Sequence, residues 1–351
     1  MDAGDGSGRT WWRRHRGVAL VAAGLLALVS ACSGGGDDGG GELEPIKVSM
    51  PVIPPNFVHV MVWVAQEQGF YEDFGLDVEI VSLDTGVTAL RGAEAGSADI
   101  AAVPTPTLIN AVAKGGTAKG FYTYSPKLDA QLVVSPDIKK CADLRGKVVG
   151  VDEVGGFAEV LTRKYYSSCG LRQSDLKYGN FPGAEGQAMA QGQAVSGILH
   201  IDEAKGVMQQ FPKAKLRPLV NLWDTDPDWH YAGYAAPQKI LDDKRDEMVA
   251  FTAANIKANA FMRDTANKAK VLDTAVEVTE LDRKILSTTY DTFIEDEMWP
   301  TDNGYPRKMV DYTADQQVEL GTLDEGEKPS YDDLVDGTIF DDAKKLVDQQ
   351  S

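Results

Sequence analysis

IKVSM at residues 46–50 is followed by FVHVMVWVAQEQG at 57–69, LDVEIVSL at 76–83 and VTALRGAEAG at 87–96. The series continues with DIAAV at 99–103 and TLINAVAKG at 107–115. Short apolar runs alternate here with amphipathic stretches, which predicts strand, helix, strand, helix, strand, helix. Gly69, Gly96 and Gly115 each stand where a helix would end, the usual place of a terminating glycine. The stretch therefore predicts an α/β lobe with a largely parallel sheet.

A second series of the same kind begins at Cys141. We expect strands at KVVGVD (147–152), YGNF (178–181) and VSGILH (195–200), which alternate with helices at about 157–169, 184–193 and 201–211. These elements predict a second α/β lobe. After YAGYAA (231–236) the pattern is almost entirely helical, so we expect the chain to return and cover the first lobe.

The first 31 residues have the features of a secretion signal. Four arginines lie between residues 9 and 16 and precede an uncharged run from Gly17 to Ala31. That run is shorter than the roughly 20 residues needed to span a bilayer. It ends in Leu-Val-Ser-Ala-Cys at 28–32, which resembles a bacterial lipobox and predicts lipidation of Cys32. An ordinary signal with a chance cysteine is the alternative, and the export route, general or twin-arginine, stays open.

Residues 32–45 follow as a Gly, Ser and Asp-rich segment with little apolar surface to bury, so we expect a flexible lipidated tether. The expected location is the extracytoplasmic face of the cell membrane, held there through Cys32. The net charge is −18, or about −20 once the signal is removed, which disfavours a nucleic-acid partner.

The chain has three cysteines, and the assignment of Cys32 to lipid leaves Cys141 and Cys169. In an oxidising compartment this pair predicts a disulfide. One cysteine precedes a predicted strand and the other ends the next helix. Two unrelated buried thiols are the alternative, because sequence alone does not give the Cα separation.

Catalytic and metal-binding patterns are missing from the sequence. It contains no GxxxxGK[ST], GxSxG, HExxH or CxxC. After the signal, the histidines are His59, His200 and His230, which do not share a ligand spacing, so we expect no metal site and no cofactor. These patterns favour a binding protein over an enzyme.

Several motifs together resemble the solute-binding proteins of ABC importers that are related to the sulfonate and thiamine-pyrimidine-precursor binders. They are GFY (69–71), GLDVE (75–79), AGSADIA (95–101), DLRGKVVGV (143–151) and CGL (169–171), and the likeness runs from about Ile46 to Ala343. The resemblance implies a two-lobed periplasmic-binding-protein-like fold, each lobe a mostly parallel sheet flanked by helices, with two crossover strands at the hinge. It also implies partners, namely a small-molecule solute and the permease subunits of an importer.

With this fold, we assign residues 46–134 to the first part of lobe 1, 135–230 to lobe 2, and 231–351 to the return into lobe 1 and the C-terminal helices. The crossings are expected near Ser135 and Tyr231. A ligand would lie between the lobes, in the cleft beyond the carboxyl ends of the strands.

Residues that follow the strands of the first lobe are the first candidates for ligand contact. The segment PPNFVH (54–59) partly resembles the Pro-Asn-x-Asn-His segment of the thiamine-precursor binders, with Asn56 and His59 matching and Val58 in place of the second Asn. His59 could equally be bonded within its own lobe. Thr85 and Thr105 follow the next strands as helix N-caps, which would direct free backbone N–H groups into the cleft.

In the second lobe, Gly155 and Gly156 would allow close backbone approach, and Phe157 would offer a stacking face. Trp229 and Tyr231 lie near the second crossing and could stack on a planar ring or pack the lobe interface. A plain loop at residues 155–157 is the alternative.

The leading hypothesis is a lipoprotein that binds a small organic solute and delivers it to an ABC importer. An aromatic or heterocyclic compound, such as a pyrimidine-type thiamine precursor, ranks above a small sulfonate or other organic anion, since no arginine stands out as an anion clamp. An enzyme of the related pyrimidine-synthase type and an extracytoplasmic sensor are the competing hypotheses.

Overall fold

The computed structural model describes residues 42–153, 155–299, 302 and 304–350, and residues 41–351 form one compact unit. The predicted signal, the lipobox with Cys32 and residues 32–41 of the predicted tether lie outside the described residues. Its last two residues, Glu44 and Pro45, belong to strand β1 (Glu44–Met50), so the tether was predicted too long at this end. Within the described part of the chain, no helix has both the length and the apolar character needed to cross a membrane.

The first sheet has five strands in the order β2-β1-β3-β10-β4. Their bounds are β1 Glu44–Met50, β2 Leu76–Ser82, β3 Ile100–Pro104, β4 Ala118–Ser125 and β10 Ala232–Pro237. Strands β2, β1 and β3 are parallel, whereas β10 runs antiparallel to both of its neighbours. The alternation predicted over residues 46–115 is confirmed by β1, β2 and β3 with the helices between them.

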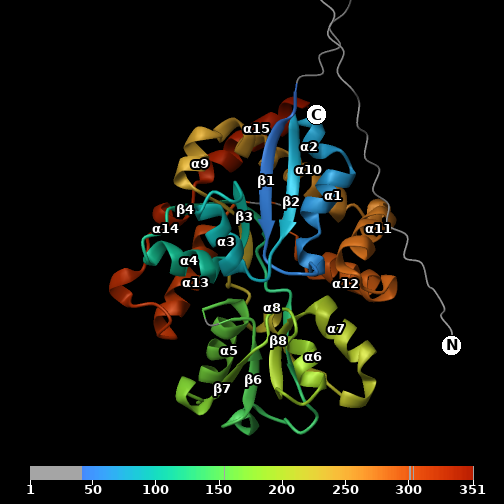
Figure 1. Cartoon of the computed structure of the whole chain (residues 1–351), viewed down its shortest axis with the longest axis vertical. Helices are drawn as coiled ribbons and strands as arrows, with labels where there is room; N and C mark the ends of the chain where they lie inside the picture. Colours follow the sequence, from blue (N-terminus) through green and yellow to red (C-terminus); the bar gives the residue numbers. More distant parts are fainter. Residues whose placement is uncertain (1–41, 154, 300–301, 303, 351) are drawn as a thin grey trace, which may run out of the picture. The chain divides into compact units, whose positions relative to one another are not determined.

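Helices cover both faces of this sheet (Figure 1). One face packs against α3 (Gly86–Glu94) and α4 (Thr105–Ala113). The helix layer of the other face contains α1 (Met61–Glu67), α2 (Phe70–Asp73), α10 (Arg245–Arg263) and α15 (Gly337–Gln350). Helices that follow β10, among them α10 and α15, therefore pack on the first sheet. The other helices after β10 include α9 Gln238–Asp243, α11 Lys268–Thr279, α12 Arg283–Glu295, α13 Arg307–Glu319 and α14 Tyr331–Leu334.

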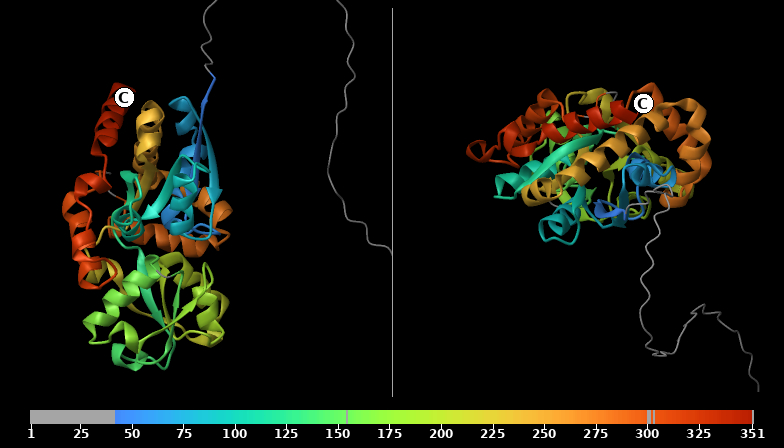
Figure 2. Two further views of the ribbon diagram at one scale, coloured as in Figure 1. Left: turned by 60° about the vertical axis from the view of Figure 1, so that its left-hand side comes forward. Right: turned by 90° about the horizontal axis from the view of Figure 1, so that it is seen from above.

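The second sheet has the order β7-β6-β8-β5-β9. Its strands are β5 Ala130–Val134, β6 Val148–Val151, β7 Lys177–Asn180, β8 Ser196–His200 and β9 Arg217–Asn221. One face packs against α5 (Phe157–Ser168), and the other against α6 (Glu185–Ala190) and α7 (Ile201–Gln210). The left view in Figure 2 shows these green-to-yellow elements gathered into one lobe and the blue and orange-to-red elements gathered into the other.

The chain crosses between the sheets twice, and the strand after each crossing is the antiparallel one of its new sheet. The first crossing lies between β4 and β5, and the second runs from β9 through α8 (Leu222–Thr225) to β10. The two crossings are joined where Tyr231 N–H donates to the Pro126 carbonyl at 2.8 Å. The boundary expected near Ser135 needs correction, because β5 already pairs with β8 and β9 of the second sheet.

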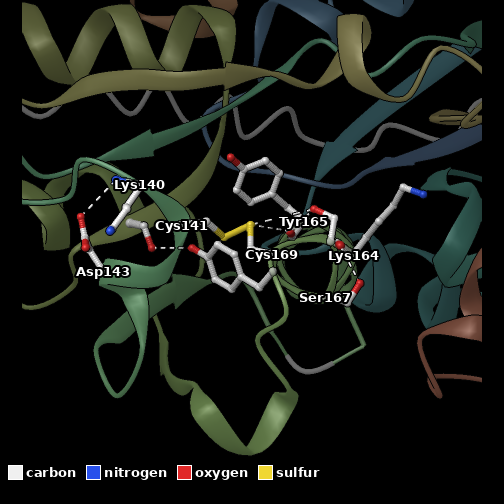
Figure 3. Close-up of a disulfide and its surroundings, with 10 residues drawn as sticks. Lys140, Cys141, Asp143, Lys164, Tyr165, Ser167 and Cys169 are labelled. Atoms are coloured by element: carbon white, nitrogen blue, oxygen red, sulfur yellow. Dashed lines mark hydrogen bonds between the residues drawn. A yellow bond between two sulfur atoms is a disulfide. The ribbon is translucent and has the colours of Figure 1, made fainter.

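Cys141 and Cys169 come together at one side of the second lobe. Cys141 begins a short 3₁₀ turn before β6, and Cys169 caps the C-terminal end of α5. Their Cα atoms are 6.0 Å apart, a usual separation for a bridge, and the sulfur atoms are bonded in Figure 3. This geometry suits the expected disulfide, whose presence in the exported protein stays a prediction.

Candidate functional site

A cleft of about 620 Å³ lies between the two sheets. Its walls come from segments that directly follow strands: residues 51–56 after β1, 84–86 after β2, Asp152 after β6, 183–187 after β7 and Glu203 after β8. Residues 279–282, between α11 and α12, form part of the rim. The cleft therefore lies where the carboxyl ends of the parallel strands of both sheets meet.

Five of the residues predicted from sequence line this cleft: Asn56, His59, Thr85, Phe157 and Tyr231. Thr85 is the N-cap of α3, where its Oγ1 accepts a hydrogen bond from Thr88 N–H at 3.1 Å. Asn56 precedes a 3₁₀ turn at residues 57–59 and makes no side-chain capping bond there. The rule that residues after strands point to the cleft thus identifies contributors from both lobes.

Thr105 and Trp229 are not among the residues that line the cleft. Thr105 is the first residue of α4 rather than its N-cap, and its buried hydroxyl is 2.6 Å from Nδ1 of His230. Trp229 is completely buried, with Lys164 Nζ 5.5 Å from its ring centre. Each of these side chains packs inside the protein.

Gly155 and Gly156 also lie outside the lining. Gly155 N–H donates to Glu159 Oε2 at 3.2 Å, and Gly156 is the N-cap of α5. A Cβ on Gly156 would lie 2.6 Å from a carboxylate oxygen of Asp152, so the residue allows close approach to that side chain. The helix that these glycines introduce carries Phe157, which does line the cleft.

Phe157 is one member of an aromatic cluster on the second-lobe wall. Its ring is stacked on His200 with centres 5.2 Å apart and planes within 4°, and the Tyr231 ring lies 4.9 Å away. One face of Phe157 is therefore already covered by the histidine. Both partners also line the cleft, so the three rings form a continuous wall.

His200 is held as a cation by Asp129. Its Nδ1 is 2.9 Å from Asp129 Oδ1, and its Nε2 is 3.4 Å from the Tyr231 hydroxyl. Burial alone would lower the pKa of His200, but the charge and hydrogen bond of Asp129, followed by Asp202, raise that pKa to about 9. From the sequence, His200 was considered only as a metal ligand, and its position in the cleft was not predicted.

His59 contrasts with His200. It is 2% exposed, and neither ring nitrogen has a hydrogen-bond partner among the described residues. Burial, and then the charge of His200 at a ring separation of 5.9 Å, hold the pKa of His59 well below its usual value. A neutral imidazole with one free donor and one free acceptor therefore lines the cleft.

Carboxyl groups dominate the polar lining, and most of them were missed from the sequence. The lining includes Asp84, Asp152, Glu185, Glu203, Glu280 and Asp282. Burial, and then the charge of Glu203, raise the pKa of Glu185 to about 9; burial likewise raises the pKa of Glu203 to about 7 and that of Asp152 to about 6. A sequence signal existed, because Glu185 and Glu203 both lie in the first turn of a helix that follows a strand.

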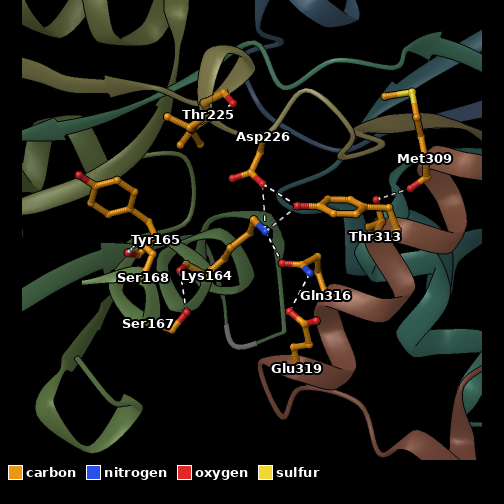
Figure 4. A network of polar contacts seen from close by, with 12 residues as sticks. Lys164, Tyr165, Ser167, Ser168, Thr225, Asp226, Met309, Thr313, Gln316 and Glu319 are labelled. Carbon is orange, nitrogen blue, oxygen red and sulfur yellow. Dashed lines mark hydrogen bonds and ion pairs between the residues drawn. The ribbon is translucent and has the colours of Figure 1, made fainter. Parts of the chain in front are cut away.

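Polar contacts connect the lobes at several places among the described residues. Phe57 N–H of the first lobe donates to Asp202 Oδ2 of α7 at 2.7 Å. On the other side, Lys164 of α5 forms an ion pair with Asp226 (2.9 Å) and donates to Gln316 of α13, as Figure 4 shows. Lys164 also donates to the hydroxyl of Tyr312 on α13. Helix α13 packs against α4 of the first lobe, so Lys164 joins the two lobes beside the second crossing.

Among the residues that the structure describes, no group of three or more His, Cys, Asp or Glu side chains is arranged to hold a metal ion. The lining includes polar and aromatic side chains that are suited to hydrogen bonding, charge pairing and ring stacking.

The fold resembles that of several solved binding proteins. The periplasmic nitrate-binding protein of Synechocystis PCC 6803 has a TM-score of 0.74 and 14% identity, with 87% of this chain and 89% of that chain covered. The ligand-binding component of an ABC-type import system from Staphylococcus aureus, with zinc bound, has a TM-score of 0.70 and 13% identity, with 86% of this chain and 99% of that chain covered. The alkanesulfonate-binding protein of Xanthomonas axonopodis pv. citri, bound to MOPS, has a TM-score of 0.68 and 14% identity, with 84% of this chain and 99% of that chain covered. At such identities the likeness shows the two-lobed periplasmic-binding-protein-like fold alone.

Sequence comparison is more specific. A protein of Haemophilus influenzae named for thiamine biosynthesis is 32% identical over 124 residues, which cover 35% of this chain. The chain spans only about two fifths of that relative, 39% of its length. The profile of the family described as NMT1/THI5 like matches residues 56–269, more than half of the chain. The resemblance seen in the sequence motifs is therefore confirmed, and the chain belongs to the NMT1/THI5-like family.

Proposed function

We propose that this chain is an extracytoplasmic solute receptor that captures a small organic compound between its lobes and delivers it to the permease subunits of an ABC importer. The cleft carries the proposal: residues that follow strands of both sheets line one space, and the described chain passes between those sheets at two crossings. A receptor of this kind closes around its ligand by rotation about such crossings. The binding proteins with the same fold support the assignment.

The proposal includes anchoring to the outer face of the cell membrane through a lipid on Cys32. Its support is the sequence of residues 1–45, with a basic segment, a short apolar run, the Leu-Val-Ser-Ala-Cys motif and a polar tether. An anchored receptor stays close to its permease, and a flexible tether of about a dozen residues reaches on the order of 20 Å.

For the ligand we propose a planar aromatic or heterocyclic compound, such as a pyrimidine-type thiamine precursor. Phe157, His200 and Tyr231 offer ring surface on one wall, and His59 offers a free donor and a free acceptor. A small sulfonate is a weaker candidate, because among the described residues no lysine or arginine lines the cleft, while six carboxyl groups do. An anion would need to be recognised by His200, which is already paired with Asp129.

The experiment is to express the full chain with its signal and to identify the co-purified small molecule by mass spectrometry. The compound should bind with a rise of several degrees in melting temperature, since saturation at 100 times Kd stabilises by about 2.7 kcal/mol. A receptor returns the compound unchanged, whereas a synthase on this fold would convert it. Cells lacking the chain should lose uptake of the compound, and retained uptake would contradict the proposal.

Phe157→Ala tests whether the ligand lies in this cleft. Loss of a ring stack costs about 1–3 kcal/mol, so affinity should fall about tenfold or more. Phe261→Ala is the matched control, because Phe261 is partly buried on α10 and contacts Phe70 outside the cleft. If Phe157→Ala, like the control, lowers only the stability of the ligand-free protein and leaves affinity unchanged, then Phe157 is a core residue and the cleft is misassigned.

A further inference from the structure

The charges that face the cleft are strongly unbalanced. Six carboxyl side chains line it, and the described lining contains no lysine or arginine. Of its two histidines, His200 is protonated but already paired with Asp129, and His59 is neutral. The described lining therefore holds more acidic than basic groups, and its cationic side chain, His200, is already paired with Asp129.

Glu185 and Glu203 are the centre of this imbalance. Glu185 is the first residue of α6 and is 5% exposed, and Glu203 is in the first turn of α7, which packs against α6. The groups that face this pair are Asp152 after β6, His200 at the end of β8 and Asp202 on α7. Lys205, the lysine of α7, does not line the cleft and donates to Thr288 of α12 instead. No lysine or arginine in the described structure is thus placed to hold both carboxyls ionised.

A separate observation on the opposite wall indicates a ligand. His59 belongs to the first lobe, lines the same cleft and is more than nine-tenths buried with both ring nitrogens unpartnered among the described residues. Buried polar groups in native proteins are normally hydrogen-bonded, and a free donor and acceptor in a cleft are positioned for ligand atoms. A ring held between His59 and the two glutamates would meet an acceptor or donor on one edge and carboxylates on the other.

We propose that the cleft captures a planar organic cation, and this inference rests on the proposed receptor function. The cation would be a ring that carries an amidinium group or a protonated amino-heterocycle. When it binds, the pair formed by Glu185 and Glu203 releases a proton to solvent. The ligand's N–H groups donate to the carboxylates that form, as in other charge-assisted pairs. The one bond that breaks is a carboxyl O–H bond, whose proton passes to solvent, and the ligand's positive charge takes the place of that proton.

The titration of the Glu185–Glu203 pair determines whether ligand affinity rises or falls with pH. Burial and mutual repulsion raise the pKa values of Glu185 and Glu203 to about 9 and about 7, so between these values the free pair holds about one proton. A bound cation favours the ionised form, so its affinity should rise with pH over this range, by up to about tenfold per unit for each proton released. A bound anion would favour the protonated pair, and its affinity would fall with pH.

The test uses three rings of similar size, namely benzamidine (cation), benzamide (neutral) and benzenesulfonate (anion), with the full chain and calorimetry at pH 6.5, 7.5 and 8.5. Benzamidine should bind most tightly, with an affinity that increases with pH, and benzamide should show no such increase. Titrations in buffers of different ionisation enthalpy measure the released proton directly on the unmodified protein.

Glu185→Gln should weaken benzamidine binding at pH 8.5 by at least about tenfold and flatten its pH profile. Glu79→Gln is the matched control, because Glu79 lies on β2 outside the cleft and pairs with Lys47 at the surface. Preference for benzenesulfonate, a flat benzamidine profile, or no benzamidine binding would overturn the proposal. Identification of the co-purified compound tests the receptor function separately. If that compound is neutral or anionic, only the inference of a cationic ligand is overturned.

Discussion

His59 gives the sharpest test of the cleft, because its two possible roles predict opposite outcomes. Its ring is buried with two unpartnered nitrogens, and a buried unsatisfied polar group costs about 1–3 kcal/mol. His59→Leu removes this cost but also removes ring contacts with Tyr124 (5.7 Å) and His200 (5.9 Å). We therefore expect the free energy of unfolding of the ligand-free protein to stay constant or rise by up to about 2 kcal/mol. At about 2–4 °C per kcal/mol, the value for proteins of 150–250 residues, the melting temperature should rise by no more than about 4–8 °C.

Binding should change in the other direction. If the ring nitrogens bond the ligand, their loss leaves ligand groups unpaired and weakens affinity by about tenfold or more. Melting temperature without ligand and dialysis with the co-purified compound measure the two effects. His230→Leu is the control, because both nitrogens of that buried histidine are within hydrogen-bond distance of threonine hydroxyls, at 2.6 and 3.1 Å. His230→Leu should destabilise. If His59→Leu destabilises as much and leaves affinity unchanged, His59 is a core residue and the reasoning is refuted.

Four further predictions concern other parts of the chain. Cys32→Ala should abolish incorporation of labelled fatty acid, and continued labelling would disprove the lipid anchor. The exported protein should show no free thiol at Cys141 or Cys169, and in the chain-entropy model removal of their bridge should cost about 3–4 kcal/mol, measured by denaturant unfolding. Lys164→Met removes the interlobe contacts of Figure 4 and leaves a partly buried carboxylate, so stability should fall by about 1–3 kcal/mol with Lys164→Arg less affected. Because the folded-state pKa of His200 is raised to about 9 from 6.5, its contribution of about 3 kcal/mol should be present below pH 6.5 and lost as pH rises through 9, seen as a falling melting temperature.

The fold was largely predictable from local patterns, but the crossings were not. Strands β1, β2 and β3 were recognised because amphipathic helices separate them and terminating glycines follow, among them Gly96 with a φ of +76°. Strands β4, β5 and β9 were not identified as strands. No helix separates β4 from β5, and the sheet that each strand joins depends on pairing with distant residues. The first boundary was misplaced for the same reason.

The candidate site was predictable in position and less so in membership. Asn56, Thr85 and Tyr231 reach the cleft because strand ends determine where the chain points. Thr105 was misassigned because its direction depends on a bond to His230, more than a hundred residues away, which no local pattern indicates. The carboxyl cluster was missed because acidic residues in the first turn of a helix have an ordinary role beside the helix dipole. Only tertiary structure shows that two such turns, at the starts of α6 and α7, face the same buried space.

The carboxyl cluster at the starts of α6 and α7 lowers the stability of the folded protein, so stability does not account for its presence. Burial raises the pKa of Glu185 to about 9, which means that the folded protein loses stability when this side chain ionises. The surroundings do not require a charge for packing, since a Cβ placed on Gly150 or Gly197 would lie 3.6 or 3.7 Å from the Cβ of Glu185. Strongly perturbed groups in a cleft are more often functional than structural. A stability cost located at the carboxyl ends of the strands, opposite a buried histidine without partners, is therefore best explained by a ligand that supplies the missing positive charge.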